Sequence, residues 1–146
     1  MAERSLPDIS EAMRDIDFCM LTTVSDGGLA GRPMSNNRNV DFDGDSYFFS
    51  DGDSRTVRDL ERDPRVSLAY QGSGGSMGVV GKPGIFIAIE GSGELIRDKA
   101  HFAEHWRDEL ERCWPQGIDT PGLTLIKVAA DRLHYWDGGD EGELKL

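Results

Sequence analysis

Short apolar runs, several of them closed by a turn that contains glycine, recur along this chain of 146 residues and limit what it can fold into. Residues 18–24 read Phe-Cys-Met-Leu-Thr-Thr-Val, and Asp26-Gly27-Gly28 follows as a hairpin turn. Similar runs occupy residues 29–35, 40–42, 46–50, 66–70, 85–96, 123–128 and 133–136. Eighteen glycines against six prolines supply the tight turns that short strands need. We therefore expect residues 1–146 to form one mainly β domain, a six-stranded antiparallel β-barrel with short helices.

Three short helices interrupt the predicted strands. Residues 9–16 carry an apolar stripe with the spacing of one helix face. A second helix is expected between an N-cap at Asp53 or Ser54 and Pro64, and a third between Asp98 and Pro115. We expect residues 72–84 to form a glycine-rich loop and residues 137–146 to form a frayed acidic tail.

The charge balance narrows the range of functions. Sixteen Lys and Arg residues against 27 Asp and Glu residues give a net charge of −11 at pH 7. A duplex-binding protein needs a basic face that releases counterions, so we expect no nucleic acid as partner. No apolar stretch is long enough for a membrane-crossing helix, and the N-terminus lacks the pattern of a signal peptide. With only two cysteines, Cys19 and Cys113, and no sign of export, we expect a cytoplasmic protein.

Three short patterns come close to known ligand motifs without matching them. His101-Phe102-Ala103-Glu104-His105 fits the H-x-x-E-H pattern of some zinc proteases, but no third ligand stands in a supporting context. The acidic run at residues 41–45 has its glycine too early for a calcium loop. The glycines at residues 72–78 do not follow G-x-G-x-x-G. We expect neither a bound metal nor a dinucleotide-binding fold.

Two segments that combine arginine with hydroxyl side chains carry the strongest functional signal. Residues 31–35 lie on a predicted strand, and residues 48–57 run from a strand into a helix, whose N-terminus offers free N–H groups. The side chains that would add donors for a phosphate are Arg32, Ser50, Ser54, Arg55 and Thr56. The alternative is that the arginines of the helix only solvate its surface and pair with Asp59 and Glu61.

The order and spacing of several segments resemble the general stress protein family within the pyridoxamine 5′-phosphate oxidase-like, FMN-binding split barrels. The resemblance covers most of the chain, and it is the set of segments, in this order, that is specific. The segments are Cys19-Met20-Leu21-Thr22-Thr23-Val24, Arg32-Pro33-Met34, Asp41-Phe42-Asp43-Gly44-Asp45, Phe48-Phe49-Ser50, Asp53-Ser54-Arg55-Thr56-Val57-Arg58, Asp63-Pro64-Arg65-Val66, Leu68-Ala69-Tyr70 and Tyr135-Trp136-Asp137.

The resemblance implies a split β-barrel that forms a homodimer, with FMN bound at the subunit interface. Arg32, Pro33 and Met34, followed by Ser35, would line the ribityl chain and the edge of the flavin ring. The residues that would form the phosphate end are Phe49, Ser50, Ser54, Arg55 and Thr56. Trp136 looks like the tryptophan that the partner subunit brings to the flavin, and Trp114 either faces the ring or packs in the core.

Two departures from the family pattern bear on the activity. The family usually has Ser-Arg-Lys where this chain has Ser54-Arg55-Thr56, so the phosphate end lacks one cation. True pyridoxamine phosphate oxidases continue past the tryptophan into a substrate-holding segment with Arg-Leu-His, whereas here Arg132-Leu133-His134 precedes Trp136. We therefore expect an FMN-dependent oxidoreductase that does not oxidise vitamin B6, with no catalytic residue assigned. The alternatives are a flavin carrier or redox sensor without turnover, and a split barrel that binds a deazaflavin or heme.

Overall fold

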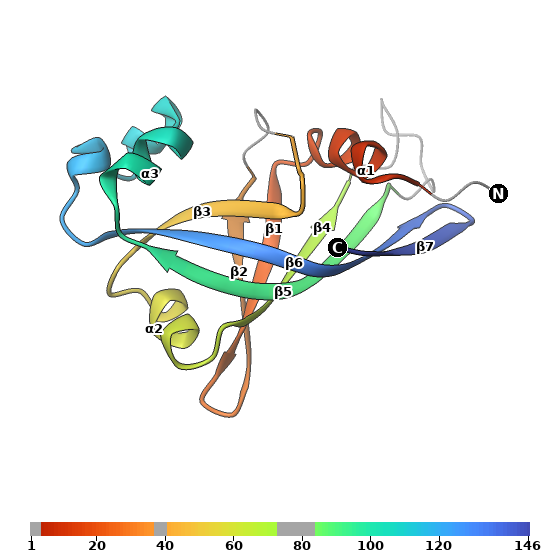
Figure 1. Ribbon diagram of the computed structural model, residues 1–146, viewed down its shortest axis with the longest axis horizontal. Coiled ribbons are helices and arrows are strands. Elements are labelled where there is room, and N and C mark those ends of the chain that lie inside the picture. Colours follow the sequence, from red (N-terminus) through yellow and green to blue (C-terminus); the bar gives the residue numbers. More distant parts are fainter. Residues whose placement is uncertain (1–3, 37–40, 73–83) are drawn as a thin grey trace.

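The computed structural model describes residues 4–36, 41–72 and 84–146. Within them, seven strands form one sheet in the order β2-β1-β4-β5-β6-β3, with β7 added to β6, and neighbouring strands are antiparallel (Figure 1). The strands are β1 Phe18–Ser25, β2 Gly28–Ser35, β3 Asp45–Asp51, β4 Arg65–Gln71, β5 Phe86–Ile96, β6 Leu123–Asp137 and β7 Asp140–Lys145. The predicted antiparallel split barrel is confirmed, with seven strands in place of six.

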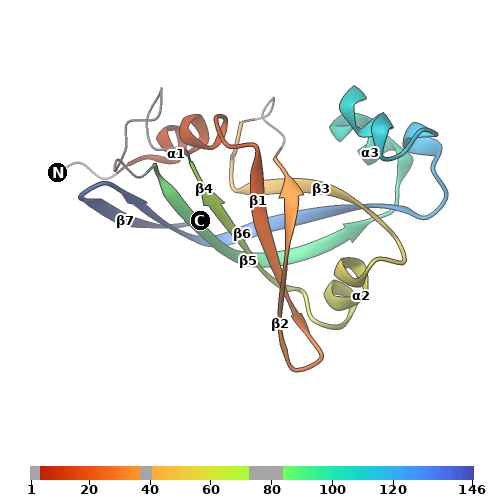
Figure 2. The ribbon, with the colours of Figure 1, turned by 180° about the vertical axis from the view of Figure 1, so that it is seen from behind.

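Short helices cover the sheet from both sides. They are α1 Leu6–Met13, α2 Arg55–Arg62 and α3 Lys99–His105, followed by the 3₁₀ turns η1 Asp108–Arg112 and η2 Gly117–Asp119. In Figure 1, α1 and α3 lie above the strands and α2 lies below them, and Figure 2 shows the same arrangement from behind. Among the described residues, no helix combines the length and the apolar character that crossing a bilayer requires.

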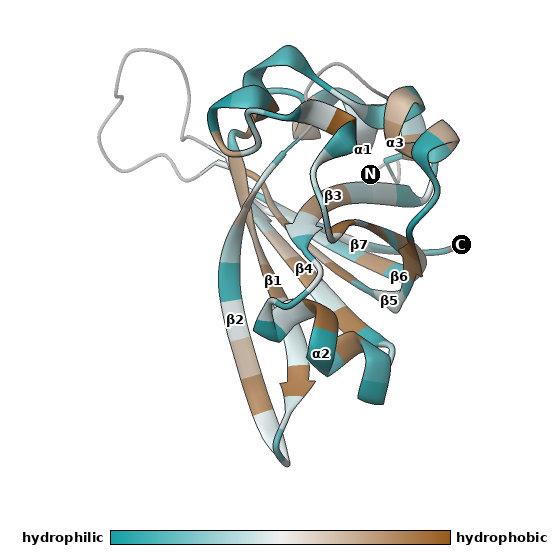
Figure 3. Ribbon diagram, turned by 90° about the vertical axis from the view of Figure 1, so that its left-hand side faces the viewer, coloured by the Kyte–Doolittle hydropathy of each residue, from teal (hydrophilic) through white to brown (hydrophobic). Residues whose placement is uncertain are grey.

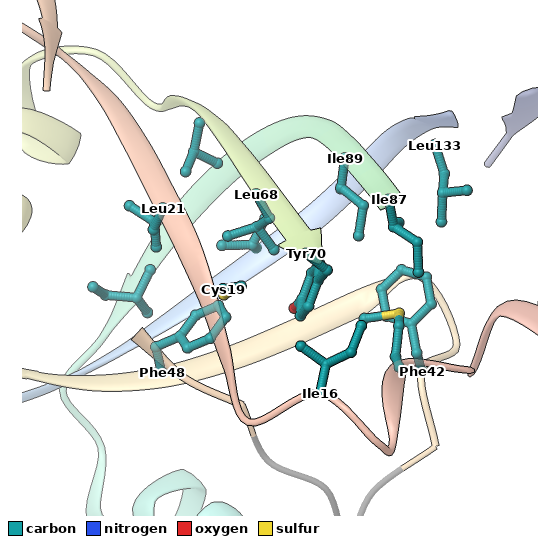
Figure 4. Close-up of a cluster of buried hydrophobic side chains, with 14 of the residues drawn as sticks. Ile16, Cys19, Leu21, Phe42, Phe48, Leu68, Tyr70, Ile87, Ile89 and Leu133 are labelled. Carbon is teal, nitrogen blue, oxygen red and sulfur yellow. The ribbon is translucent and has the colours of Figure 1, made fainter. Parts of the chain in front are cut away.

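The core lies inside the curled sheet, where side chains from five strands meet (Figure 4). On β1 the residues alternate, so that Cys19 and Leu21 face the core while their neighbours face outward. Val57 and Leu60 on α2 join the same core, which fixes that helix against the sheet. Each such buried side chain contributes about 1.5–3 kcal/mol to folding.

The sheet leaves an opening between its two terminal strands. In the described residues β2 pairs only with β1, and β3 pairs only with β6. Helix α2 contacts β1, β3 and β5, and Figure 3 shows it beside the β1–β2 hairpin, close to this opening. Edge strands carry backbone groups without ladder partners, which can bind a ligand. The edges of β2 and β3 that stay unpaired within the described part of the chain therefore offer backbone groups to which a ligand can bind.

Several details differ from the sequence prediction. Asp41 and Phe42 form no strand, because Phe42 is buried against α1, where its N–H donates to Ser10 Oγ at 2.8 Å; Val40 lies outside the described residues. The predicted strands at 123–128 and 133–136 are one strand, β6. The predicted glycine-rich loop falls, apart from its two end residues, outside the described residues.

The last ten residues were predicted to fray, and this prediction is wrong. Asp137 pairs with Asp140 across a tight turn, and β7 then runs back along β6. Gly138 has a φ of 63° in that turn, which a residue with a side chain rarely adopts. A hairpin needs only a turn and cross-strand partners, so the acidic composition did not prevent it.

Candidate functional site

Two arginines from separate parts of the chain reach neighbouring hydroxyl groups on β1. Arg32 on β2 lies opposite Leu21, and its Nη1 donates to Thr23 Oγ1 at 2.8 Å. Arg55 is the first residue of α2, and its Nε and Nη2 donate to Ser25 Oγ at 2.9 and 2.7 Å. Thr23 and Ser25 are successive inward-facing residues of β1, so the strand spacing places the two guanidinium groups side by side.

A single buried carboxylate, that of Asp59, lies next to both arginines. Asp59 lies one helical turn after Arg55, and it accepts hydrogen bonds from Thr23 Oγ1 at 2.8 Å and Ser25 Oγ at 3.1 Å. Its Oδ2 is 3.5 Å from Arg32 Nη2 and 3.9 Å from Arg55 Nε. Burial by itself raises the pKa of Asp59, but the two hydrogen bonds and the two arginine charges outweigh it and lower the pKa below its ordinary value. The carboxylate is therefore ionised at neutral pH.

The turn between β3 and α2 adds two further hydroxyl groups. Ser54 is the N-cap of α2, where its Oγ accepts from the N–H of Val57 at 3.3 Å and lies 2.8 Å from Ser50 Oγ. Gly52 allows this turn to approach the backbone at Gly122, since a Cβ on residue 52 would lie 2.5 Å from the carbonyl oxygen of Gly122. The structure thus gathers Arg55, the serine pair and the start of α2 in one place.

The electrostatics of this cluster favour an anion. The Arg55 side chain is 59% exposed and that of Arg32 is 19% exposed, so a ligand in solution can reach both guanidinium groups, Arg55 more readily than Arg32. Burial, together with the like charge of Arg55, lowers the pKa of Arg32 in spite of Asp59. Two neighbouring cations against one carboxylate leave an excess positive charge, which an anionic group would balance.

Sequence comparison identifies the family of this chain. A family sequence model described as "Pyridoxamine 5'-phosphate oxidase like" matches residues 5–146. The chain belongs to this pyridoxamine 5′-phosphate oxidase-like family. No curated protein sequence matches it.

Solved structures of this shape include proteins with different descriptions. A Clostridium acetobutylicum protein related to general stress protein 26 of Bacillus subtilis gives a TM-score of 0.78 at 20% identity, over 100% of this chain and 97% of that one. The general stress FMN/FAD binding protein of Xanthomonas citri gives 0.74 at 24% identity, over 92% and 89%. A heme binding protein of Mycobacterium smegmatis gives 0.70 at 16% identity, over 99% and 60%. At these identities the likeness shows a shared fold.

The other residues suggested by the resemblance to the oxidase-like family lie around the cluster in different ways. Met34 faces inward and packs against the core, while Pro33 and Ser35 are exposed on the outer face of β2. Thr56 is buried, so its hydroxyl does not extend the cluster toward the opening. The ring of Phe49 packs in the layer formed by α3 and the 3₁₀ turns, so this side chain lies outside the cluster.

The two predicted tryptophans have separate surroundings. Trp114 packs near Phe49, and its Nε1 donates to Asp51 Oδ1 at 2.8 Å, so it fastens the η1–η2 segment to β3. Trp136 lies on the outer face of the sheet, where it is 39% exposed. Trp136 lies twelve residues beyond Thr124, the partner of Ser50, on β6, and its side chain faces outward, whereas Thr23 and Ser25 beside the arginines face inward. One chain therefore does not bring Trp136 to the arginines.

The histidines and cysteines form no competing centre in the described parts of this oxidase-like chain. His101 Nδ1 lies 2.8 Å from Asp98 Oδ2, and His105 stacks on Tyr47 with ring centroids 3.7 Å apart. No group of three potential metal ligands occurs among the described residues. Burial raises the pKa of the Cys19 thiol to about 11, which keeps it protonated and poorly nucleophilic at neutral pH.

Sequence reasoning missed the central residue of the site. Asp59 entered the prediction only as a surface partner of the helix arginines, although its pairing with Arg55 at i, i+4 is observed. The available signal was the spacing of Val57, Asp59 and Leu60, which places this carboxylate toward the buried side of α2. The roles of Thr23 and Ser25 depend on the strand register, which the sequence of β1 alone does not reveal.

Proposed function

We propose that this protein binds FMN as a homodimer and acts as a flavin-dependent oxidoreductase of the general stress type. The observation that carries the proposal is the convergence of Arg32 and Arg55 beside the opening between β2 and β3. A flavin mononucleotide has the two features that this place can recognise: a phosphate dianion, and a flat ring that can lie along a strand edge. A similar structure, that of the Xanthomonas citri protein, is described as FMN/FAD binding, which supports the choice of cofactor.

The residues present fit the phosphate of FMN. Arg55 would donate to the phosphate together with the hydroxyls of Ser50 and Ser54, and Arg32 would lie between it and the ribityl chain. Thr56 stands where related proteins have a lysine, and because it is buried, the two arginines supply the charge by themselves. When bound, FMN would supply hydride transfer at its ring, and the chain would supply position and shelter from water.

The outer face of the sheet supports the homodimer. Phe18 is 63% exposed and Met20 44% exposed, and Phe86 and Trp136 are neighbours on the same face. Large apolar side chains gathered in this way mark an interaction surface. A second copy is the occupant we propose, because a two-fold pair would bring the Trp136 of each chain toward the arginine cluster of the other.

The surroundings of Trp136 support a substrate other than a phosphorylated B6 vitamer. Strand β7 places Glu141 opposite Trp136 in register, and Glu141 Oε2 lies 2.7 Å from His134 Nε2. The turn beyond Trp136 carries Asp137 and Asp140. These carboxylates would repel the phosphate of a B6 substrate. By the resemblance, this is the place where true pyridoxamine phosphate oxidases hold that substrate.

The contacts of the histidines favour flavin over heme. A heme protein of this fold would need an axial ligand, most often an imidazole nitrogen, facing the porphyrin. His101 pairs with Asp98, His105 stacks on Tyr47, and His134 pairs with Glu141. None of the three contacts the arginine cluster.

Titration of the purified protein with FMN, riboflavin and heme tests the proposal. We expect one FMN per chain, with a flavin absorbance spectrum, and weaker binding of riboflavin. Stoichiometric heme binding without flavin binding would overturn it. Oxidation of reduced nicotinamide by the loaded protein would distinguish an oxidoreductase from a flavin carrier. Saturable peroxide production from pyridoxine 5′-phosphate would contradict the exclusion of vitamin B6 oxidation.

A further inference from the structure

The hydrogen bonds around Asp59 form two parallel relays. In the first, Arg32 donates to the hydroxyl of Thr23, which donates to Oδ2 of Asp59. In the second, Arg55 donates to the hydroxyl of Ser25, which donates to Oδ1 of Asp59. The two arginines thus reach the two oxygens of one carboxylate through two successive inward-facing residues of β1.

The ionised carboxylate fixes the direction of every hydrogen bond in these relays. A carboxylate has only acceptors, so both hydroxyls must point their protons at it. Each hydroxyl then has only lone pairs left to offer on its other side, and a guanidinium group, which has only donors, is the partner that suits them. Arg32 Nη2 also donates directly to Asp59 Oδ2 at 3.5 Å, and Arg55 Nε lies 3.9 Å from the same oxygen, so the arginines are held by this polarity as well as by charge.

We propose that Asp59 is a positioning residue, which holds Arg32 and Arg55 in the arrangement that receives the phosphate of FMN. This inference rests on the proposed FMN site and adds to it the residue that organises it. Without the relays, two long cationic side chains that lie next to each other would repel one another and would have to be ordered by the ligand. With them, that ordering is complete before the phosphate arrives, and binding becomes tighter as a result.

A positioning role of Asp59 and a purely electrostatic role of its charge predict opposite effects of Asp59→Asn on FMN affinity. If Asp59 acts only as a negative charge near the phosphate, its removal tightens FMN binding. If it positions the arginines, its removal weakens FMN binding, because the amide NH₂ now donates to one hydroxyl and turns that relay around. Asp53→Asn is the matched control, since Asp53 is exposed beside the N-terminus of α2 and its loss changes the charge by the same amount.

The relays can also be broken one at a time. Thr23→Val keeps the shape of the side chain and removes the hydroxyl between Arg32 and Asp59, whereas Thr23→Ser keeps the hydroxyl. Ser25→Ala and Ser25→Thr form the equivalent pair for Arg55. In each pair only one variant loses the hydroxyl, so a loss of FMN affinity confined to that variant reports on the relay.

The test measures dissociation constants of FMN and riboflavin for these variants, with circular dichroism to confirm folding. We expect Asp59→Asn to weaken FMN about tenfold, with riboflavin changed less than twofold, and Asp53→Asn to leave FMN unchanged or slightly tighter. Thr23→Val and Ser25→Ala should each weaken FMN severalfold, and the hydroxyl-retaining partners should restore it. Tighter FMN binding by Asp59→Asn, or equal losses for FMN and riboflavin, would overturn the inference.

A ligand-free measurement separates this inference from the proposed function. In the wild-type protein without flavin, the hydrogen-bonded guanidinium protons, on Nη1 of Arg32 and on Nε of Arg55, should give dispersed, slowly exchanging NMR signals, unlike those of the exposed Arg58. Asp59→Asn should move both signals to the position typical of solvated arginine. A wild-type protein that shows these signals but binds no FMN would overturn the proposed function and leave the role of Asp59 intact. Signals unchanged by Asp59→Asn would overturn the positioning role whatever the protein binds.

Discussion

The two faces of strand β1 have opposite properties. On the inner face, Thr23 and Ser25 make their hydrogen bonds to residues of the same chain. On the outer face, Phe18 and Met20 leave large apolar surfaces in water. The inner face thus builds a polar site that one chain completes, and the outer face builds a surface that we propose a second chain completes. Because its side chains alternate between its faces, one strand can supply both halves of the site that we propose at the interface.

A charge placed on the outer face should have the largest of the predicted effects, a loss of dimer stability. Met20→Glu would bury a carboxylate in the proposed dimer interface, so we expect the dimer dissociation constant to rise more than about a hundredfold. Analytical ultracentrifugation measures this constant. The control Gln116→Glu adds the same charge at an exposed position of the 3₁₀ segment and should leave the dimer intact. If Met20→Glu were as dimeric as the wild type, the outer face would not be the interface.

Removal of an arginine should have the next largest effect, confined to the inner-face site. Arg55→Ala should weaken FMN about ten- to a hundredfold, the range for loss of a hydrogen bond to a charged group, and should leave riboflavin unchanged. Fluorescence titration with both flavins measures the ratio. Arg58→Ala, on the exposed side of the same helix, should change neither constant. Equal losses for the two flavins would show that Arg55 does not meet the phosphate.

Mixing two defective variants tests whether the halves come from different chains. Arg55→Ala removes a residue of the inner-face site, and Trp136→Ala removes a residue of the outer face. In an equilibrated equal mixture, half of the dimers are mixed, and each of these has one site with both residues intact, which is about a quarter of all sites. We expect a quarter of the sites to bind FMN with wild-type affinity and to quench its fluorescence. No recovery would place both residues in one site of one chain, or Trp136 outside the site.

The smallest expected effect concerns stability and pH. The pKa of Asp59 is lowered in the folded protein, so its contribution to the free energy of unfolding is present above the ordinary Asp pKa of about 4. This contribution is lost as the pH falls through the lowered pKa of the folded state. Asp59→Asn should therefore be less stable than the wild type at pH 7, by on the order of 1–3 kcal/mol, and the gap should narrow below pH 4. Urea unfolding at a series of pH values measures it, and a gap independent of pH would contradict an ionised, hydrogen-bonded Asp59.

Local patterns foretold most elements of the fold. The capping residues Ser54 and Asp98 begin α2 and α3, as their side chains predict. The register between β5 and β6 shifts at Gly91, where a Cβ would clash with the carbonyl oxygen of Ala129, so a glycine is required there. Strand β7 was missed because its acidic, glycine-rich sequence has little strand propensity, and its pairing with β6 decides its conformation.

Most of the strands, the helix starts and the two arginine-bearing segments can be predicted from the sequence, because turn residues, caps and alternating apolar residues act over a few positions. That Arg32 and Arg55 meet, that Asp59 lies beside them on the buried side, and that Trp136 lies on the other face follow from the tertiary packing. These relations depend on strand order and register, which bring together residues distant in the chain. A buried carboxylate and a solvent-exposed one look the same in a sequence, and only packing shows that Asp59 has exchanged water for four partners from three elements.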